Sequence, residues 1–249
     1  HNTSTDKMEY IPYDLDNTLG VEWIGRDWGT RNMYDWQQHG DHYRPLYERI
    51  MNNPELRDQY TFYMNQLINE TLDIDSLITA IGERRNMIAP YILYDPYYPL
   101  DYGYTANDFY NSYTSGVGGH VPYGIFPFLQ TRVASIQDQL ESTAMQPVIK
   151  YISHIRNSVS EVSVRAYVDV QYLPATVNID YTIEGQSQSI EPMFDDGQHN
   201  DGDAGDHIYG GIMDERPESA FVNYQVQAND KQNKTSLMPC ESIYIPAAG

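Results

Sequence analysis

Hydrophobic positions follow two different periods along this chain, and the change falls near residue 145. After Pro54, apolar residues recur at helical spacing; they are Leu56, Tyr60, Tyr63, Met64, Leu67 and Ile68. Residues spaced by three, four, seven and eight positions lie on one face of an α-helix, and proline is favoured in the first turn. The pattern therefore predicts an amphipathic helix that begins at Pro54.

Two more helices are predicted in this first part of the chain. Asp73 or Asp75 can cap a helix that ends near Pro90, and another helix follows Pro127. The apolar positions of these two helices are Leu77, Ile78, Ile81 and Ile88, then Leu129, Val133, Ile136 and Leu140. The tyrosine-rich stretch 91–113 between them is expected to form a loop, and the polar stretch 21–43 is expected to be irregular.

From about residue 147 the apolar period becomes two. Apolar and polar residues alternate over 162–170, 177–183 and 222–226, which predicts strands of a β-sandwich of roughly 100 residues. The change of pattern falls at Met145-Gln146-Pro147. The expected fold class is therefore α+β in two domains. The first, 1–145, is mainly helical, and the second, 146–249, is an immunoglobulin- or fibronectin-III-like β-sandwich.

Composition and charge narrow the partners of this chain. It has 249 residues and a formal net charge of −20. The electric field of this charge repels nucleic acid and anionic membranes, and it favours binding of a basic protein substrate or of divalent cations. The single cysteine, Cys240, excludes an internal disulfide, and no apolar run of 18 residues is present to span a membrane. Because the chain starts at His1 without a signal peptide, we expect a fragment or a processed form.

Asp14 and Asp16 are the main candidates for chemistry. Two carboxylates two positions apart on an extended segment point to the same side, and Mg²⁺ prefers such oxygen ligands beside a phosphate. The run Asp14-Leu15-Asp16-Asn17-Thr18 also matches the first motif of haloacid-dehalogenase-type phosphatases. In that interpretation Asp14 attacks phosphorus and Asp16 protonates the leaving group. Such an enzyme requires a parallel sheet, which the helical pattern after the motif does not predict.

More of the chain resembles the CotH family of spore-coat-type atypical protein kinases. The segment from Tyr10 to Asp16, followed by Gly20, is similar to that family's I-P-W-D-x-D…G signature. The segment 45–60 resembles a helical segment of the family, and 88–95 resembles its next helix end and loop. Arg132 with Leu140 resembles its closing helix. The resemblance covers roughly residues 1–142. Tyr13 departs from it, because the family usually has tryptophan there.

The CotH resemblance implies a C-terminal kinase lobe whose Asp14 and Asp16 bind Mg²⁺ or Mn²⁺ with ATP. Kinase-like sites place a metal-binding asparagine about a dozen residues before the second metal-binding aspartate, which makes Asn2 a further candidate. No catalytic residue and no nucleotide-binding N-terminal lobe are identified in this chain. We therefore expect it to be inactive alone. The implied function is phosphoryl transfer to Ser or Thr of a protein substrate.

A second acidic motif lies in the β-rich part. The run from Asp195 to Asp206, completed by Tyr209, resembles a signature of immunoglobulin-like modules on secreted bacterial proteins. The resemblance implies a location that is secreted, periplasmic or on the bacterial cell surface. Carboxylates with glycines suit a Ca²⁺ loop, whose candidate ligands are Asp196, Asp201, Asp203 and Asp206. The same residues equally suit a double turn in which Asp side chains bind the backbone.

A different class of function also fits the sequence. Exposed aromatic residues such as Trp28 and Tyr97 could stack on sugars or contact a cell-surface component, with the sandwich as a spacer. In that case the chain would be a carbohydrate- or protein-binding module rather than part of a kinase.

Overall fold

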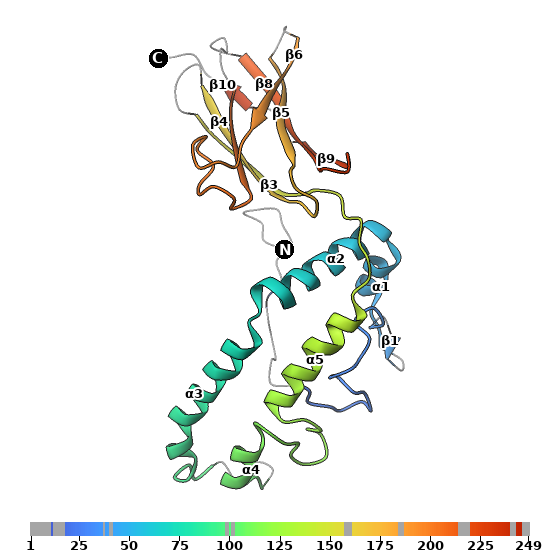
Figure 1. Ribbon diagram of the computed structural model, residues 1–249, viewed down its shortest axis with the longest axis vertical. Coiled ribbons are helices and arrows are strands. Elements are labelled where there is room, and N and C mark those ends of the chain that lie inside the picture. Colours follow the sequence, from blue (N-terminus) through green and yellow to red (C-terminus); the bar gives the residue numbers. More distant parts are fainter. Residues whose placement is uncertain are drawn as a thin grey trace. The chain divides into compact units, whose positions relative to one another are not determined.

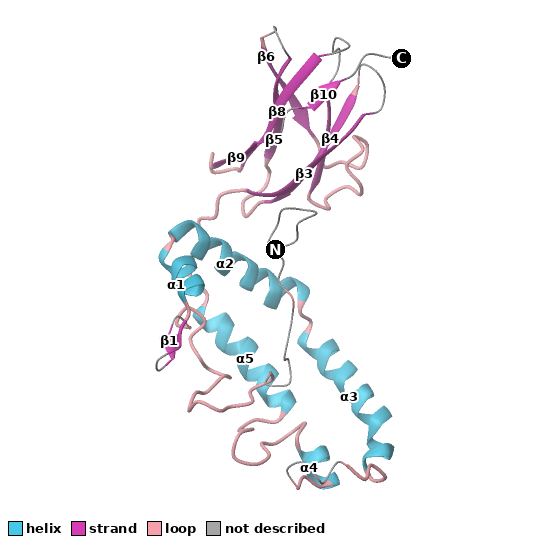
Figure 2. Ribbon diagram, turned by 180° about the vertical axis from the view of Figure 1, so that it is seen from behind, coloured by secondary structure: helices cyan, strands magenta, loops and turns pink. Residues whose placement is uncertain are grey.

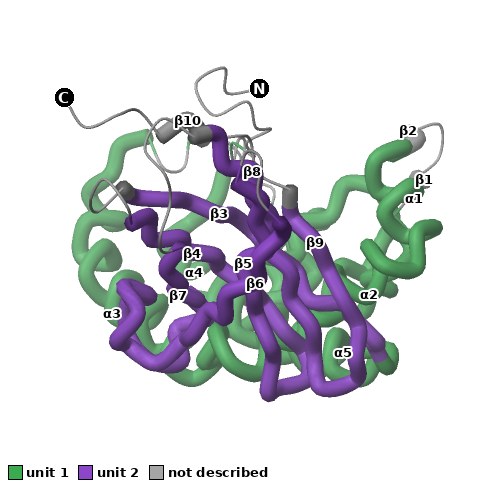
Figure 3. Tube along the Cα trace, turned by 90° about the horizontal axis from the view of Figure 1, so that it is seen from above, with its two compact units in different colours: residues 1–142 green, residues 143–249 purple. Residues whose placement is uncertain are grey.

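The computed structural model describes residues 11, 18–36, 38–39, 42–97, 100, 103–156, 161–183, 187–213, 220–239 and 243–245. The chain divides into two compact units, His1–Ser142 and Thr143–Gly249, which Figure 3 colours separately. The described sheets are all antiparallel and the helices belong to the first unit, so the α+β class is confirmed. No parallel sheet of the phosphatase type occurs among the described residues.

The first unit is built mainly from helices (Figure 1). A short hairpin, β1 (Gln38–His39) and β2 (His42–Tyr43), precedes the helices. The described helical elements are α1 (Pro45–Asn52), α2 (Pro54–Gln66), the π-helical turn η2 (Leu67–Thr71), α3 (Ile74–Ile92), α4 (Ala106–Asn111) and α5 (Ile125–Gln139). The predicted helices at 54–68, 73–90 and after 127 are therefore confirmed.

The helix starts follow from local chemistry. The Asn53 side chain accepts hydrogen bonds from the backbone N–H groups of Glu55 and Leu56, and Pro54 stands where no N–H is needed. Asp73 caps α3 by accepting from the N–H groups of Asp75 and Ser76, at 3.1 and 3.2 Å. Of the two caps left open by the sequence, Asp73 is therefore the one used.

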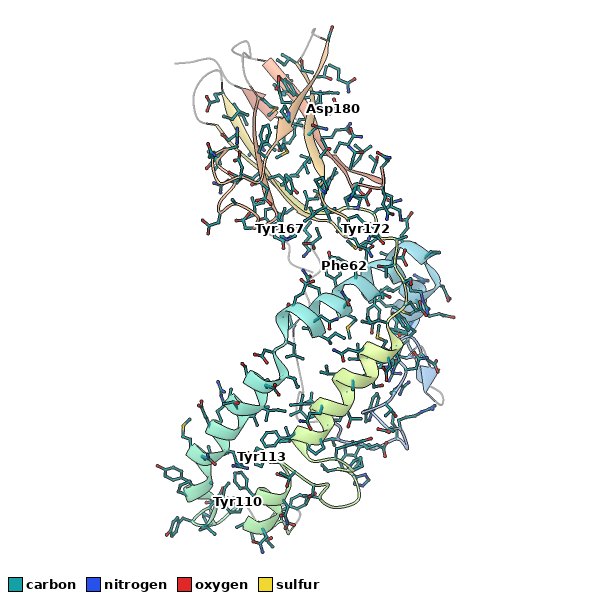
Figure 4. The ribbon with its side chains drawn as sticks, viewed as in Figure 1. Phe62, Tyr110, Tyr113, Tyr167, Tyr172 and Asp180 are labelled. Atoms are coloured by element: carbon teal, nitrogen blue, oxygen red, sulfur yellow. The ribbon has the colours of Figure 1, made fainter. Side chains whose placement is uncertain are left out.

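The tyrosine-rich stretch 91–113 contains a helix that the sequence pattern did not predict. Thr105 and Asp108 form a reciprocal capping box at the start of α4. Phe109, Tyr113 and Ala89 of α3 belong to one buried cluster, and Figure 4 labels Tyr113. The local signal was Thr-x-x-Asp, which the high tyrosine content obscured. Tyr97 remains 74% exposed in the preceding loop.

Two antiparallel sheets make up the second unit (Figure 2). One has the strand order β3-β4-β7, with strands Val148–Arg156, Val162–Asp169 and Ile208–Met213. The other has the order β10-β8-β5-β6, with β9 also paired to β8. Its strands are β5 (Thr176–Ile183), β6 (Gln188–Met193), β8 (Ala220–Asn229), β9 (Thr235–Pro239) and β10 (Ile243–Ile245).

Both sheets of the second unit pack onto one hydrophobic core. Alternate residues of β4, β5 and β8 point into it, as the period of two predicted, and Val164, Ile179 and Val226 are fully buried. Met193 and Met213 fill the space between them. The polar residues of β5 and β8 therefore share the outer face of the larger sheet. The immunoglobulin-like classification of this unit stays a prediction.

The two outer edges of the larger sheet are interrupted. On one side of β8, the short strands β9 and β10 pair with successive stretches, residues 225–229 and 220–222. On the other side, β6 carries Pro192 opposite Asn178. Both edges are thus made of short strands, and β6 and β9 each contain a proline.

We predict that Asp73→Ala lowers the free energy of unfolding of the first unit by about 1 kcal/mol, because two N–H groups of α3 lose their acceptor. Chemical denaturation followed by circular dichroism at 222 nm measures the change. Asp75→Ala is the matched control, since it alters only a first-turn charge and costs at most about 0.5 kcal/mol. Equal losses for the two variants would contradict the assigned cap.

Candidate functional site

The predicted metal ligands Asn2, Asp14 and Asp16 lie outside the described residues. The description resumes at Thr18, so the end of the aspartate motif can be placed. Leu19 and Gly20 both have positive φ, at 57° and 89°. A Cβ on Gly20 would lie 2.6 Å from Cδ2 of Phe128 on α5. Glycine is therefore needed here both for the backbone turn and for close contact with α5.

The irregular stretch 18–36 is held by side chains from three helices. Its centre is Met33, which is completely buried. Gln139 of α5 accepts a hydrogen bond from the Met33 N–H at 2.7 Å, while the hydroxyl groups of Tyr47 and Tyr60 donate to the Met33 carbonyl. Burial raises the pKa of Tyr47 to about 12, and Tyr60 adds to the shift. The hydroxyl of Tyr47 thus remains a donor at physiological pH.

An aromatic pocket opens beside this anchored stretch. Its volume is about 340 Å³, and its lining includes Leu19, Gly20, Trp28, Trp36, Phe128 and Arg132. The rings of Trp28 and Trp36 meet edge to face with centroids 5.6 Å apart. The end of the aspartate motif therefore forms part of the wall of an apolar pocket with one guanidinium.

Arginines gather around Trp36. The guanidinium of Arg31 lies over the rings of Trp28 and Trp36, at 4.9 and 5.5 Å from their centroids, and that of Arg132 lies 5.9 Å from Trp36. Arg132 also donates to the Arg31 carbonyl, and Arg44 donates to the Trp36 carbonyl. Burial lowers the pKa of Arg31, and Arg26 and Arg44 act in the same direction.

On the surface near this pocket, the carboxylate of Asp27 is hydrogen-bonded to the phenol of Tyr123. Tyr123 donates to both carboxylate oxygens of Asp27, at 2.9 and 3.0 Å, and Gly29 N–H and the Thr30 hydroxyl also donate to Asp27. Burial opposes ionisation of Asp27, but these hydrogen bonds outweigh it and lower its pKa. A hollow of about 510 Å³ adjoins this pair, with Glu22 in its lining. The oxygens of Asp27 are therefore already engaged as hydrogen-bond acceptors.

Trp28 packs against neighbouring side chains and also lines the aromatic pocket. Its ring contacts Trp36 and the Arg31 guanidinium, whereas Trp23 is 58% exposed and stacks on His120 at 3.9 Å. The sequence did not single out Arg31, Arg44 or His120. The available signal was the alternation of arginine and tryptophan over residues 23–44, where aromatic rings can hold guanidinium groups.

The acidic loop of the second unit directs its carboxylates to its own backbone. Asp201 is buried and accepts from the N–H groups of Asp196, Gly197 and His199 at 2.6 to 2.9 Å. Burial alone would raise the pKa of Asp201, but these hydrogen bonds outweigh it and lower the pKa.

Other carboxylates of the loop act in the same way. Asp195 accepts from the N–H groups of Gly205 and His207, and Asp206 accepts from those of Asp203 and Ile208. Within the residues that the structure describes, no group of three or more His, Cys, Asp or Glu side chains is arranged to hold a metal ion. These hydrogen bonds are those expected of the double turn, and the calcium site at Asp196, Asp201, Asp203 and Asp206 stays a prediction.

Comparison with known proteins addresses the first unit. A family model described as CotH kinase protein matches residues 1–116.

Residues 1–116, slightly less than half of the chain, are therefore a CotH-like segment.

The CotH segment includes Asp14, Asp16 and the Trp28–Trp36 pair, so the resemblance of the sequence motifs is confirmed over these residues. It ends before α5, and the resemblance of Arg132 and Leu140 to the family's closing helix stays a prediction. None of the curated proteins matches the chain. Among solved structures, the chain is similar to "Crystal structure of Br derivative BhCBM56" at 8% identity. The aligned region covers 37% of this chain and 88% of the other chain. The TM-score is 0.28, which is too low to indicate a shared fold.

We predict that Gly20→Ala destabilises the CotH segment by roughly 1–3 kcal/mol, because a Cβ adds left-handed strain and a clash with Phe128. Gly25→Ala is the matched control. Gly25 also has positive φ, at 70°, but a Cβ there meets no atom within 4 Å. The stability lost in Gly25→Ala should be limited to about 1 kcal/mol, the cost of placing alanine in a left-handed backbone conformation. Denaturation midpoints that coincide for the two variants would contradict the packing of the motif against α5.

We predict that Asp201→Ala lowers the free energy of unfolding of the second unit by roughly 2–3 kcal/mol at pH 7, because three N–H groups lose their acceptor. Asp203→Ala, at an exposed position of the same loop, is the control and should be nearly neutral. Because the folded-state pKa of Asp201 is depressed, its contribution is present above the unfolded value of about 3.9 and is lost as pH falls through the lower folded value. Urea unfolding at pH 7 and pH 3 measures whether the difference from the variant shrinks in acid.

Proposed function

We propose that this chain supplies the metal-binding part of a phosphoryl-transfer site, in which Asp14 and Asp16 hold Mg²⁺ or Mn²⁺ beside the phosphates of ATP. The observation that carries the proposal is the CotH kinase match over residues 1–116, which includes both aspartates. The donor set fits the ions, because hard divalent cations prefer carboxylate oxygens. Asn2 is the third proposed ligand.

The anchored Gly20 supports this role for the aspartates. Metal ligands must be held in a fixed direction to bring a phosphate and its acceptor together. The motif ends in the Leu19–Gly20 turn against Phe128, and the stretch that follows is fastened to α5 through Arg31 and Met33. The aspartates therefore lie within six residues of a backbone position that is fixed by packing.

The substrate in this proposal is a Ser- or Thr-containing protein, and the net charge of −20 favours a basic one. A further lobe would hold the nucleotide, as the resemblance implies, and the site of action would be outside the cytoplasm or on the cell surface. No helix in the described part of the chain is long and apolar enough to cross a membrane. The immunoglobulin-like module stays part of the proposal.

The strand order of the second unit supports the immunoglobulin-like module. Its first, second and fifth strands form one sheet, and the third, fourth, sixth, seventh and eighth form the other. A constant-type immunoglobulin domain differs by placing the fourth strand with the first sheet. The arrangement is therefore closer to the fibronectin-III variant of the sandwich.

The competing functions find less support. Antiparallel sheets in both units do not provide the core that a haloacid-dehalogenase-type phosphatase needs. Trp28 is half-buried and packs against Trp36 and Arg31, which gives less support to a sugar-binding role for its ring. The comparisons favour neither alternative.

We predict that the chain binds Mn²⁺ and that Asp14→Asn and Asp16→Asn each weaken binding by roughly an order of magnitude, because each removes a charged oxygen ligand. Titration calorimetry with and without ATP measures the affinity, and Glu55→Gln on exposed α2 serves as the charge-matched control. Unchanged Mn²⁺ affinity in both aspartate variants would refute the metal role.

We further expect no phosphate transfer from Mn²⁺-ATP to a basic Ser-rich peptide by this chain alone.

A further inference from the structure

The outer face of the larger sheet in the second unit carries an ordered array of polar side chains. Strand register places Asn178 opposite Gln227, Asp180 opposite Gln225 and Thr182 opposite Asn223. Inward neighbours on β5 and β8 are buried, so these residues face away from the core. On β6, Gln188 lies opposite Thr182 and extends the array by one strand.

Asp180 lies at the centre of the array (Figure 4). Its carboxylate accepts hydrogen bonds from the side-chain amides of Gln188 on β6 and Gln225 on β8, the latter at 2.9 Å. A carboxylate offers about four acceptor positions, and each glutamine amide has two N–H groups and a carbonyl oxygen. The network thus fixes the directions of three polar groups while leaving donors and acceptors for another molecule.

This face carries fewer charged side chains than the chain as a whole. At the outward positions of β5, β6, β8 and β9 that the structure describes, Asp180 is the one charged side chain. A solvated sheet face usually carries lysine, arginine and glutamate, and 20% of this chain is charged. Here the polar groups are amides and hydroxyls, which both donate and accept hydrogen bonds.

Apolar side chains border the array on three strands. Phe221 of β8, Ile190 of β6 and Leu237 of β9 are 47%, 60% and 55% exposed. Ile190 lies opposite Asp180 and Leu237 opposite Gln227, so apolar and polar groups alternate across the face. With strands about 4.8 Å apart and outward residues about 6.8 Å apart, the array measures about 14 by 20 Å.

We propose that this face, centred on Asp180 and Gln225, binds a neutral oligosaccharide. A sugar chain presents hydroxyl groups that donate and accept, and it also presents apolar C–H faces, so it matches both components of the surface. Nucleic acids and anionic glycans are disfavoured by Asp180 and by the net charge of −20. Protein interfaces are instead enriched in aromatic residues, methionine and arginine at their centre, and Phe221 is the one residue of these types at the described outward positions of β5, β6, β8 and β9.

Affinity electrophoresis of the full 249-residue chain in gels that contain neutral polysaccharides tests the proposal. The panel includes cellulose-, mannan-, xylan- and starch-type polymers. We expect at least one polymer to retard the chain, and Asp180→Ala and Gln225→Ala each to weaken that binding by roughly fivefold to tenfold. Phe221→Ala should weaken it as well, without involving the hydrogen-bond network.

Ser153→Ala is the matched control because Ser153 is exposed on β3, a strand of the other sheet. Thermal unfolding confirms that each variant is folded before its mobility is interpreted. If none of the polymers retards the chain, the proposal is overturned. Retention of full binding by both Asp180→Ala and Gln225→Ala would also overturn it, as would an equal loss in Ser153→Ala. None of these outcomes depends on metal binding by Asp14 and Asp16.

Discussion

The hydrogen bonds to the backbone of Arg31 and Met33 are the interactions on which the first unit depends. Stretch 18–36 has no helix or strand of its own, so its buried backbone groups need partners from elsewhere. Arg132 and Gln139 of α5 reach across about 100 residues of sequence to provide them, and Tyr47 and Tyr60 complete the set. Since α5 also meets Gly20 through Phe128, one helix positions both the end of the aspartate motif and the walls of the aromatic pocket.

Aspartate has a structural role in the acidic loop and a metal-binding role in the proposed phosphoryl-transfer site. In the acidic loop, the oxygens of Asp195, Asp201 and Asp206 accept hydrogen bonds from N–H groups and shape the turn. In the proposed phosphoryl-transfer site, Asp14 and Asp16 would direct their oxygens to a cation. A metal site, by contrast, requires carboxylate oxygens that face a cation.

The parts of the fold that the sequence predicted are those in which local pattern and tertiary packing agree. Apolar residues alternate along β4 because one side of the strand faces the hydrophobic core. Asn53 and Asp73 mark helix starts because their side chains replace missing backbone partners. Helix α4 was not predicted, because its six residues are too few for a periodic signal and its capping box lies among tyrosines.

The site was less predictable than the fold. Arg31 and Trp36 meet because α5 folds back onto the stretch that contains them, which no local spacing reveals. Likewise, the residues around Asp180 come from β5, β6 and β8, and their proximity depends on strand register rather than on any motif. Long-range contacts of this kind become visible only when the pairing of elements is known.

The interrupted edges of the larger sheet affect how the second unit behaves at high concentration. A long, regular edge strand presents a row of unpaired N–H and C=O groups that can template pairing with another chain. Here one edge is shared by the short strands β9 and β10, and Pro192 and Pro239 each remove a donor from an edge. Growth of the larger sheet by strand addition at these edges is thereby discouraged.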